Sequence, residues 1–448
     1  MFLVDSFTAG EKLRAVDLCL KNAKIPYRGL LVEAGVAIDK GKIVAVHRSR
    51  LPPADKTVNL RGSLLLPGIV DVHVHFRDPG LTWKEDFASG SRAAAAGGVT
   101  TVCDMPNCVP PTNSLKRFKE KIKIARSKSH VDFGLHAALP DDVGEGAKLE
   151  KAGAASFKVY TESQGDSEIP DFLGLGLTIS AHAEAPDVLK KFKPRGKVIE
   201  EFIRCRPKLA EISEIARLLR LVHGAPLHLC HVTTSESINL IAKAKRAGEV
   251  TCEATPHHLL LSSNHLRKLG PLAQTLPPLR SPADRIAVLM ALRNGTIDIV
   301  ASDHAPHTLK EKKKGKMNIW ESPPGIAGVE TSLPLIHTLV RKRRLSIFRL
   351  VEAMCTMPAK TFGLRGESGM PKGVIKPGAD ADFVALDQRK KWKIKGEELH
   401  GKTKFTPFEG YGVIGKPFMT LVRGEVVFED GEVVGKAGYG RFIPRSSS

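Results

Sequence analysis

Apolar residues recur along the chain in two patterns, and these patterns predict two kinds of structure. In residues 15–46 and again in 381–434, short apolar runs are separated by turn signals such as Asp39-Lys-Gly41 and Glu429-Asp-Gly431. Runs of this kind are typical of β-strands joined by hairpins, and the run 420–428 is interpreted as one such strand. Because both ends of the chain carry the pattern, we expect them to meet in one small β-sandwich domain.

Between these ends, apolar strand-like runs alternate with amphipathic helical stretches such as 115–125. Strands that alternate with helices predict parallel βα units. Six or more units fit a (β/α)8 TIM-type barrel better than an open sheet, and no Gly-rich dinucleotide fingerprint follows any of the runs. The expected strands are 68–72, 99–102, 155–159, 177–181, 227–229 and 297–301. We therefore predict a barrel over 67–366, with a small β domain built from 1–66 and 367–448.

The composition is that of an ordinary globular protein, with 42% hydrophobic and 26% charged residues. No apolar run of 18 or more residues predicts a membrane span, and the N-terminus meets polar residues too early for a signal peptide. The 7 cysteines include no C-x-x-C pair, so reduced thiols and a cytoplasmic location are expected. Cys230 is interpreted as a small buried hydrophobe that points away from the face of its neighbour His231.

The formal net charge of +20 is the one unusual feature of the composition. Basic residues are spread along the chain, and the one obvious cluster, 310–316, is short. No nucleic-acid-binding signature accompanies it, and aromatic residues for base stacking make up only 6% of the chain. We expect no nucleic-acid partner, whereas an anionic substrate or an acidic partner stays open.

Side chains suited to metal binding follow the first predicted barrel strand. His73 and His75 are two residues apart, so both can point to one face of a strand and hold one ion. Arg77 follows, where its guanidinium can bind a carboxylate. Active sites of such barrels lie at the carboxyl ends of the strands. The sequence thus predicts a metal site at this end of the barrel.

Later predicted strands end in further candidate ligands. His182, His231 and Asp303 each close an apolar run. Imidazoles and a carboxylate suit zinc and similar divalent ions. Lys158 lies inside another run, where an unpaired ammonium would be costly. Two interpretations of Lys158 stay open, a lysine that reaches water at the barrel mouth and a lysine whose amine has captured carbon dioxide as a metal-bridging carbamate.

Taken together, these motifs resemble the dihydroorotase family of the amidohydrolase superfamily, from about residue 15 to 435. The resemblance rests on residues in eight segments, namely 73–80, 84–86, 94–101, 104–107, 255–259, 277–280, 302–307 and 324–330. It implies a distorted barrel and reversible hydrolysis of dihydroorotate to N-carbamoyl-L-aspartate, the third step of de novo pyrimidine biosynthesis.

The resemblance also implies two Zn²⁺ ions per subunit. His73 and His75 would hold one ion together with Asp303, His182 and His231 would hold the other, and carboxylated Lys158 would bridge them. A hydroxide between the metals would attack the ring amide, with Asp303 as general base and acid. Arg77, Asn107 and His307 would bind the carboxylate of the substrate.

Departures and alternatives remain. Leu276 stands where many family members have an Asn that contacts substrate, and the segment 310–316 is either a mobile loop over the site or a solvated surface loop. Allantoinases and hydantoinases share the metal ligands, but Arg77 and Asn107 favour a ring with a carboxylate. An inactive scaffold for an enzyme such as aspartate carbamoyltransferase is disfavoured because every ligand position is filled. That enzyme is a candidate partner, and a homo-oligomer is expected.

Overall fold

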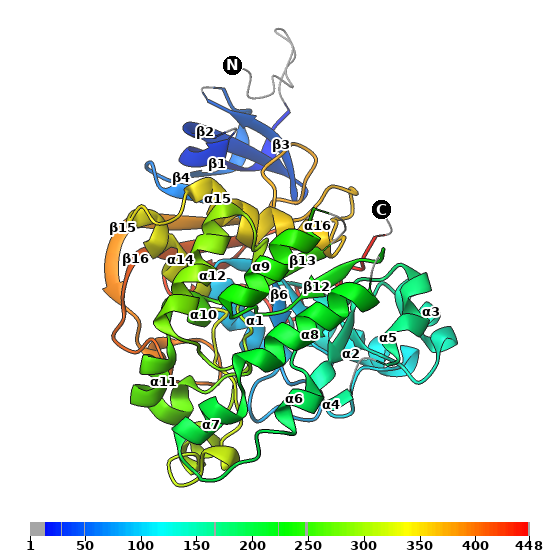
Figure 1. The fold of residues 1–448 in the computed structure, drawn as a ribbon. Helices are drawn as coiled ribbons and strands as arrows, with labels where there is room; N and C mark the ends of the chain where they lie inside the picture. The colour runs from blue at the N-terminus through cyan, green and yellow to red at the C-terminus, as the bar shows by residue number, and fades with distance from the viewer. Residues whose placement is uncertain are drawn as a thin grey trace.

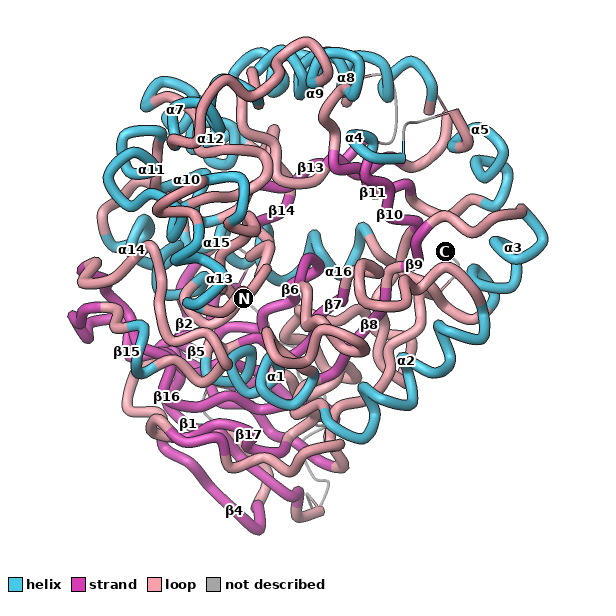
Figure 2. Tube along the Cα trace, turned by 90° about the horizontal axis from the view of Figure 1, so that it is seen from below, coloured by secondary structure: helices cyan, strands magenta, loops and turns pink. Residues whose placement is uncertain are grey.

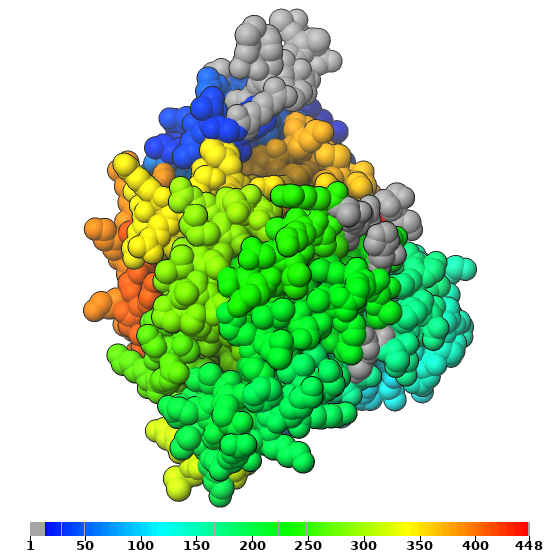
Figure 3. All heavy atoms as spheres, in the orientation of Figure 1, coloured from blue at the N-terminus to red at the C-terminus, as the bar shows by residue number. Residues whose placement is uncertain are grey.

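The computed structural model describes residues 14–27, 29–48, 50–164, 167–222, 224–246 and 250–446. Residues 1–13 and 447–448 of the two predicted terminal β segments lie outside the described residues. Figure 1 shows the first strands above a larger body of strands and helices, and Figure 3 shows the two parts packed together on this face.

The two ends of the chain form one sheet, which we call the terminal sheet. Within the described residues its order is β18-β17-β16-β15-β5-β1-β2-β3, with β4 paired to β1. Antiparallel pairing of β5 with β15 places Leu66 opposite Val384, so the first and last segments are joined directly. Its strands are β1 Val16–Tyr27, β2 Leu30–Asp39, β3 Lys42–His47, β4 Ala54–Asn59, β5 Leu64–Pro67, β15 Phe383–Lys393, β16 Gly412–Val422, β17 Glu425–Glu429 and β18 Glu432–Val433.

The prediction of a single strand over 420–428 is wrong. A turn at Arg423 and Gly424 separates β16 from β17, and both residues have positive φ, 46° and 79°. Gly424 adopts this backbone at little cost, so the chain can reverse within a run that is rich in apolar residues.

The central residues form a ring of parallel strands, seen along its axis in Figure 2. A parallel bridge between Val74 and His304 closes the ring. This confirms the predicted fold class, a TIM-type barrel with a small β domain from both termini. The strands are β6 Ile69–Val74, β7 Val99–Asp104, β8 Asp132–Leu135, β9 Ala137–Ala138, β10 Phe157–Tyr160, β11 Ile179–His182, β12 Leu227–Leu229, β13 Val250–Ala254 and β14 Ile299–Val300.

Helices surround this ring. The longer ones are α1 Phe87–Ala96, α2 Leu115–Lys128, α3 Val143–Lys151, α8 Lys208–Leu221, α9 Ser235–Ala244, α12 Pro282–Asn294 and α14 Ser332–Arg341. Shorter ones are α4 Thr161–Gln164, α5 Ile169–Phe172, α6 Pro186–Leu189, α7 Ile199–Cys205, α10 Pro256–Leu260, α11 Ser263–Leu269, α13 Leu309–Lys314, α15 Ile347–Val351 and α16 Met357–Thr361. Figures 1 and 2 show the longer helices outside the strands, as expected for βα units.

A buried group of charges joins the barrel to the terminal sheet, and we call it the Lys372 cluster. The ammonium of Lys372 lies 2.6 Å from Asp132 at the start of β8, 2.7 Å from Asp380 and 2.8 Å from Asp382, just before β15. The guanidinium of Arg423 also pairs with Asp132. Charges taken out of water need such partners, so these residues hold the two parts of the molecule in one arrangement.

The chain returns to the barrel after the terminal sheet. Phe442 forms a parallel bridge with Phe133 of β8, and the Ile443 amide donates to the Phe133 carbonyl at 2.8 Å. The C-terminal segment therefore covers part of the barrel.

Candidate metal-binding active site

A cavity of about 250 Å³ opens at the carboxyl ends of the barrel strands. Most of the predicted site residues line it, namely His73, His75, Arg77, Asn107, His182, His231, Asp303 and His307. Lys158 is fully buried next to them rather than in the lining. Parallel strands end at one rim of a barrel, which is why residues so distant in sequence meet here.

One group of donor atoms consists of His73, His75 and Asp303. The Nε2 atoms of the two imidazoles lie 3.4 Å and 3.1 Å from the same Oδ1 atom of Asp303. Donor atoms from the three side chains all lie within 4.8 Å of one another, as the ligands of a single cation do.

Hydrogen bonds fix which nitrogen of each imidazole faces this group. His73 Nδ1 bonds to Glu253, and His75 Nδ1 lies 2.6 Å from Oδ1 of Asn107. Each Nδ1 acts as a donor to an oxygen, so in the neutral form of each ring the Nε2 lone pair is left for the cavity. A carboxylate behind a histidine is the arrangement that orients metal-binding imidazoles.

His182 and His231 form a second group. Nδ1 of His182 lies 3.1 Å from Nε2 of His231, and the other side of the His182 ring donates to Glu184 at 3.0 Å. With its Nε2 proton on Glu184, the His182 ring turns a lone pair toward His231. The two facing nitrogens fit two corners of a coordination sphere.

Lys158 and Cys230 lie beside both groups. The Lys158 Nζ atom is 2.9 Å from the Cys230 Sγ atom, and Sγ can also join His73 and Glu253 as a metal donor. The prediction that Cys230 points away from the site is therefore wrong. Strand β12 ends at Leu229, and His231 has a φ of 34°, so the alternation of side chains expected of a strand does not extend to these residues.

Burial and neighbouring charges shift the pKa values of several side chains in the site. Burial alone would lower the pKa of His73, but Glu253 and Asp303 outweigh burial and raise it to about 10. Burial lowers the pKa of His75 to about 4, so this ring is neutral at pH 7. Burial opposes ionisation of Asp303, yet the neighbouring imidazoles His73 and His75 hold its pKa below the ordinary value. The carboxylate of Asp303 thus stays anionic beside one neutral ring, His75, and one ring whose protonated form its carboxylate neighbours favour, His73.

Three site residues have a left-handed backbone. Arg77, His231 and Asp303 have φ values of 63°, 34° and 45°. Side chains other than glycine rarely adopt such angles, and the strain is tolerated where the surroundings enforce it, often at functional sites. At all three positions the chain leaves a strand and turns its side chain toward the cavity.

Arg77 and His307 form the opposite wall of the cavity. The His307 Nε2 atom lies 2.9 Å from the Pro324 carbonyl and 3.4 Å from the Arg77 guanidinium. On the other side of the ring, Lys84 Nζ is 3.1 Å from Nδ1. Burial and the cations Arg77, Lys312 and Lys84 lower the pKa of His307, so its ring is neutral and its Nδ1 atom accepts a hydrogen bond from Lys84.

Sequence reasoning missed several residues of the site. Glu253 lies in β13, a strand that the apolar pattern did not reveal because a buried carboxylate interrupts it. Tyr160 lines the cavity with a buried hydroxyl that bonds to no described residue. Its position two residues after Lys158, on the same face of a strand, was the available signal. Leu276, where a polar contact was in doubt, also lines the cavity.

The basic segment 310–316 forms helix α13 and the turn that follows it. Lys312 is fully buried, and its amine donates to the carbonyls of Gln274 at 3.3 Å and Pro323 at 2.9 Å. The cavity is lined instead by Pro323, Pro324 and Gly325, farther along the chain. The hydrogen bond from Lys312 to Pro323 therefore holds in place the segment that lines the cavity.

Comparison with known families agrees with this geometry. The model of the amidohydrolase family matches residues 64–158 and 168–427, which include every site residue named above except Tyr160. The chain belongs to the amidohydrolase family and is a hydrolase.

The relatives of this chain include proteins named dihydroorotase and proteins named hydantoinase. A dihydroorotase of Methanothermobacter thermautotrophicus is 42% identical over 440 residues, covering 96% of this chain and 97% of that protein. An L-hydantoinase of Paenarthrobacter aurescens is 34% identical, covering 96% and 98%. The solved structure of the L-hydantoinase from Arthrobacter aurescens superposes with a TM-score of 0.92 at 33% identity, covering 96% of this chain and all of that one.

None of the helices in the described residues is long and apolar enough to cross a membrane.

Proposed function

We propose that the chain is a dihydroorotase that interconverts (S)-dihydroorotate and N-carbamoyl-L-aspartate, a step of pyrimidine biosynthesis. Dihydroorotases are prominent among its relatives, including one at 42% identity over nearly the whole chain. The ring of this substrate carries a free carboxylate, whereas a hydantoin ring does not, so the groups that face the ring decide between the two activities.

The state of Arg77 is the observation that carries the proposal. The residue is 8% exposed, its Nε atom has no hydrogen-bond partner, and within the described residues it forms no ion pair. A buried cation without a partner is costly, and a guanidinium binds a carboxylate through two parallel hydrogen bonds. The carboxylate of dihydroorotate would supply the missing partner, with His307 beside it.

The donor atoms fit two divalent cations. Imidazole lone pairs, one carboxylate and buried Lys158 make the nitrogen and oxygen set that zinc prefers, and Nδ1 of His231 bonds to no described residue. His73, His75 and Asp303 would hold one ion, His182 and His231 the other, and Lys158 as a carbamate would reach both. When bound, such ions lower the pKa of water and polarise the ring carbonyl.

The chain's own residues then manage orientation and protons. Arg77 and His307 hold the carboxylate, so that the ring amide lies over Asp303. Asp303 takes a proton from the attacking water as the new C–O bond forms, and returns it to the ring nitrogen as the C–N bond breaks. Burial raises the pKa of Tyr160 well above its usual value, so its hydroxyl keeps its proton and can donate to the carbonyl oxygen.

Hydantoinase activity is the second candidate, since the Arthrobacter aurescens structure is so similar and Leu276 replaces a polar contact. The test is hydrolysis of L-dihydroorotate by the zinc-loaded protein, followed through the ultraviolet absorbance of the ring, with hydantoin and allantoin in parallel. Turnover of dihydroorotate alone, lost with a chelator, supports the proposal. Turnover of hydantoin instead would contradict the role of Arg77, and metal binding without turnover would favour the scaffold alternative.

Four further expectations stay predictions. These are the cytoplasmic location, the homo-oligomer, the association with aspartate carbamoyltransferase and the division into segments 1–66, 67–366 and 367–448.

A further inference from the structure

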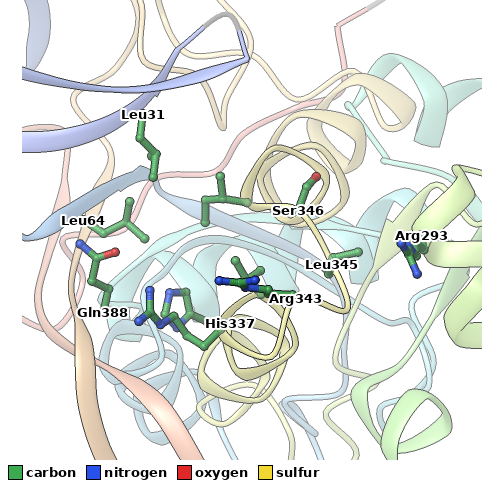
Figure 4. A pocket seen from close by; sticks show the side chains of 11 residues that line it. Leu31, Leu64, Arg293, His337, Arg343, Leu345, Ser346 and Gln388 are labelled. Atoms are coloured by element: carbon green, nitrogen blue, oxygen red, sulfur yellow. The ribbon is translucent and has the colours of Figure 1, made fainter.

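A second cavity, remote from the active site, lies where the barrel meets the terminal sheet. Its volume is about 500 Å³, within the range of small-molecule sites. Figure 4 shows Leu31 and Leu64 on one side, and Arg343 between His337 and Arg293 in this view. We call this cavity the arginine pocket.

All the charged residues that line the arginine pocket are positive. Arg293, Arg341 and Arg343 all contribute to it, and its other polar residues are neutral side chains such as Gln388 and Ser346. Among the described residues, none of the three guanidinium groups forms a hydrogen bond or an ion pair with a side chain, and no carboxylate lines the pocket. Three free guanidinium groups around a hollow favour a ligand with several negative oxygens, such as a phosphate.

The remaining lining adds an apolar surface and an imidazole acceptor. Leu31, a large hydrophobe that is 47% exposed, faces the hollow together with Leu64. His337 Nδ1 lies 2.7 Å from the Ile414 carbonyl and donates to it, which leaves Nε2 as an acceptor. Burial, together with nearby Arg341, lowers the pKa of His337, so the ring stays neutral despite its cationic surroundings. The pocket thus suits a ligand that combines an anionic end with an apolar or aromatic end.

A simpler explanation of the arginines is the helix dipole. Arg293 and Arg341 lie in the last turns of α12 and α14, where the partial negative charge of the helix end favours a cation. Arg126 and Arg220 lie in the last turns of α2 and α8 in the same way, outside this lining. They therefore provide a matched control, because the dipole explanation treats all four residues alike.

The arginine pocket is separate from the active site. Helix α14 begins just after Gly328 and Val329, whose amides lie 3.1 Å and 3.3 Å from Nδ1 of His304, next to Asp303. Its other end, Arg341, lines the pocket. A helix of ten residues spans about 15 Å, so a ligand here does not touch the substrate.

We propose that the arginine pocket binds a phosphorylated small molecule that also carries an apolar or aromatic group, of the nucleotide class. The phosphates would contact Arg293, Arg341 and Arg343, and the apolar group would lie against Leu31 and Leu64. This proposal does not depend on the reaction at the metal site.

The test is calorimetric titration of the zinc-loaded protein with ATP and with inorganic triphosphate, at low salt. We expect saturable binding with a Kd below about 1 mM, tighter for ATP because its base can cover the leucines. The double variant R293Q/R341Q should weaken binding about tenfold or more, whereas the control R126Q/R220Q should leave it unchanged.

A third variant, Ser346→Asp, keeps an N-cap acceptor for α15 while it adds a carboxylate to the pocket, so it should also weaken binding without unfolding the protein. Absence of saturable binding by the unmodified protein would overturn the proposal. An equal loss of affinity in the control R126Q/R220Q would also overturn it. The same holds if R293Q/R341Q and S346D bind triphosphate and ATP as tightly as the unmodified protein does.

Discussion

The Nζ atom of Lys158 lies 2.9 Å from the Sγ atom of Cys230, and both side chains are buried beside the two histidine groups. An amine in this place has few polar partners, and charge there opposes the protonation of His73 and His231. Conversion of the amine to a carbamate replaces that positive charge with a negative one between the two predicted metal positions.

Lys158→Ala should therefore lower bound zinc from two ions per chain to one or none, and reduce turnover at least about hundredfold. Metal content after dialysis, measured by mass spectrometry, checks the first part. Added acetate should restore some activity, since it can occupy the vacated space as a bridging carboxylate. Full zinc content with normal turnover would exclude Lys158 as a bridge.

Asp303→Asn should keep most of the metal, because an amide oxygen still faces His73 and His75, but turnover should fall about 10²- to 10⁴-fold. The loss follows from removal of the base that carries the proton from water to the ring nitrogen. Zinc content and kcat are measured together. Asp298→Asn is the control, since that carboxylate pairs with Lys245 outside the cavity. Near-native turnover of D303N would rule out the proton transfer.

Arg77→Gln should raise KM for dihydroorotate about tenfold to a hundredfold, the effect of losing a charged hydrogen bond, with a smaller change in kcat. The exposed Arg92, changed to Gln, controls for net charge. Steady-state kinetics with dihydroorotate and a hydantoin distinguish the two rings. An unchanged KM for dihydroorotate would remove Arg77 from the carboxylate pocket.

Lys312→Met should change how stability depends on pH. Burial, reinforced by Arg77 and Lys84, lowers the pKa of Lys312 from 10.5 to about 7. Between these two values the unfolded chain binds more protons than the folded one, so this residue makes stability rise with pH from about 7 to 10.5. The variant should lose that rise, measured as the urea midpoint at several pH values. Lys313→Met, at an exposed neighbour, should keep it.

Lys372→Met should destabilise the folded protein by about 3 to 5 kcal/mol, because Asp382 then loses its buried cation, while Asp132 keeps Arg423 and Asp380 keeps only the partly exposed Lys42. Equilibrium unfolding in urea measures the change, and Lys376→Met at an exposed site is the control. A loss below about 1 kcal/mol, the value of a surface ion pair, would show that the Lys372 cluster does not hold the sheet to the barrel.

The sequence predicted the site best where a periodic rule applied. His73 and His75 follow the two-residue repeat of a strand. Because barrel active sites lie at the carboxyl ends of the strands, Asp303, at the end of another strand, was expected near them. The rule of alternation failed at Cys230 because the backbone leaves the strand there. Glu253 escaped notice because its role depends on His73 and His228, which lie on other strands.

The arrangement of the two termini was predictable only in outline. Similar strand patterns at both ends indicated that they meet, but nothing local to β5 indicates that Leu66 faces Val384. The bridge from Phe442 to Phe133 and the contact of Lys372 with Asp132 likewise join distant parts of the chain. Such contacts arise from packing and burial, which a local pattern does not encode.

The pairing of β5 with β15 also sets an order of events during synthesis on the ribosome. Strands β1 to β5 are made first, but β5 finds one of its partners only when residues near 384 have emerged. Until then one edge of an apolar strand, Leu64–Pro67, is exposed to other chains. When several ribosomes translate one messenger RNA, aggregation of the nascent chains therefore competes with folding during this period. Chaperones that shield the N-terminal strands would raise the yield of folded protein.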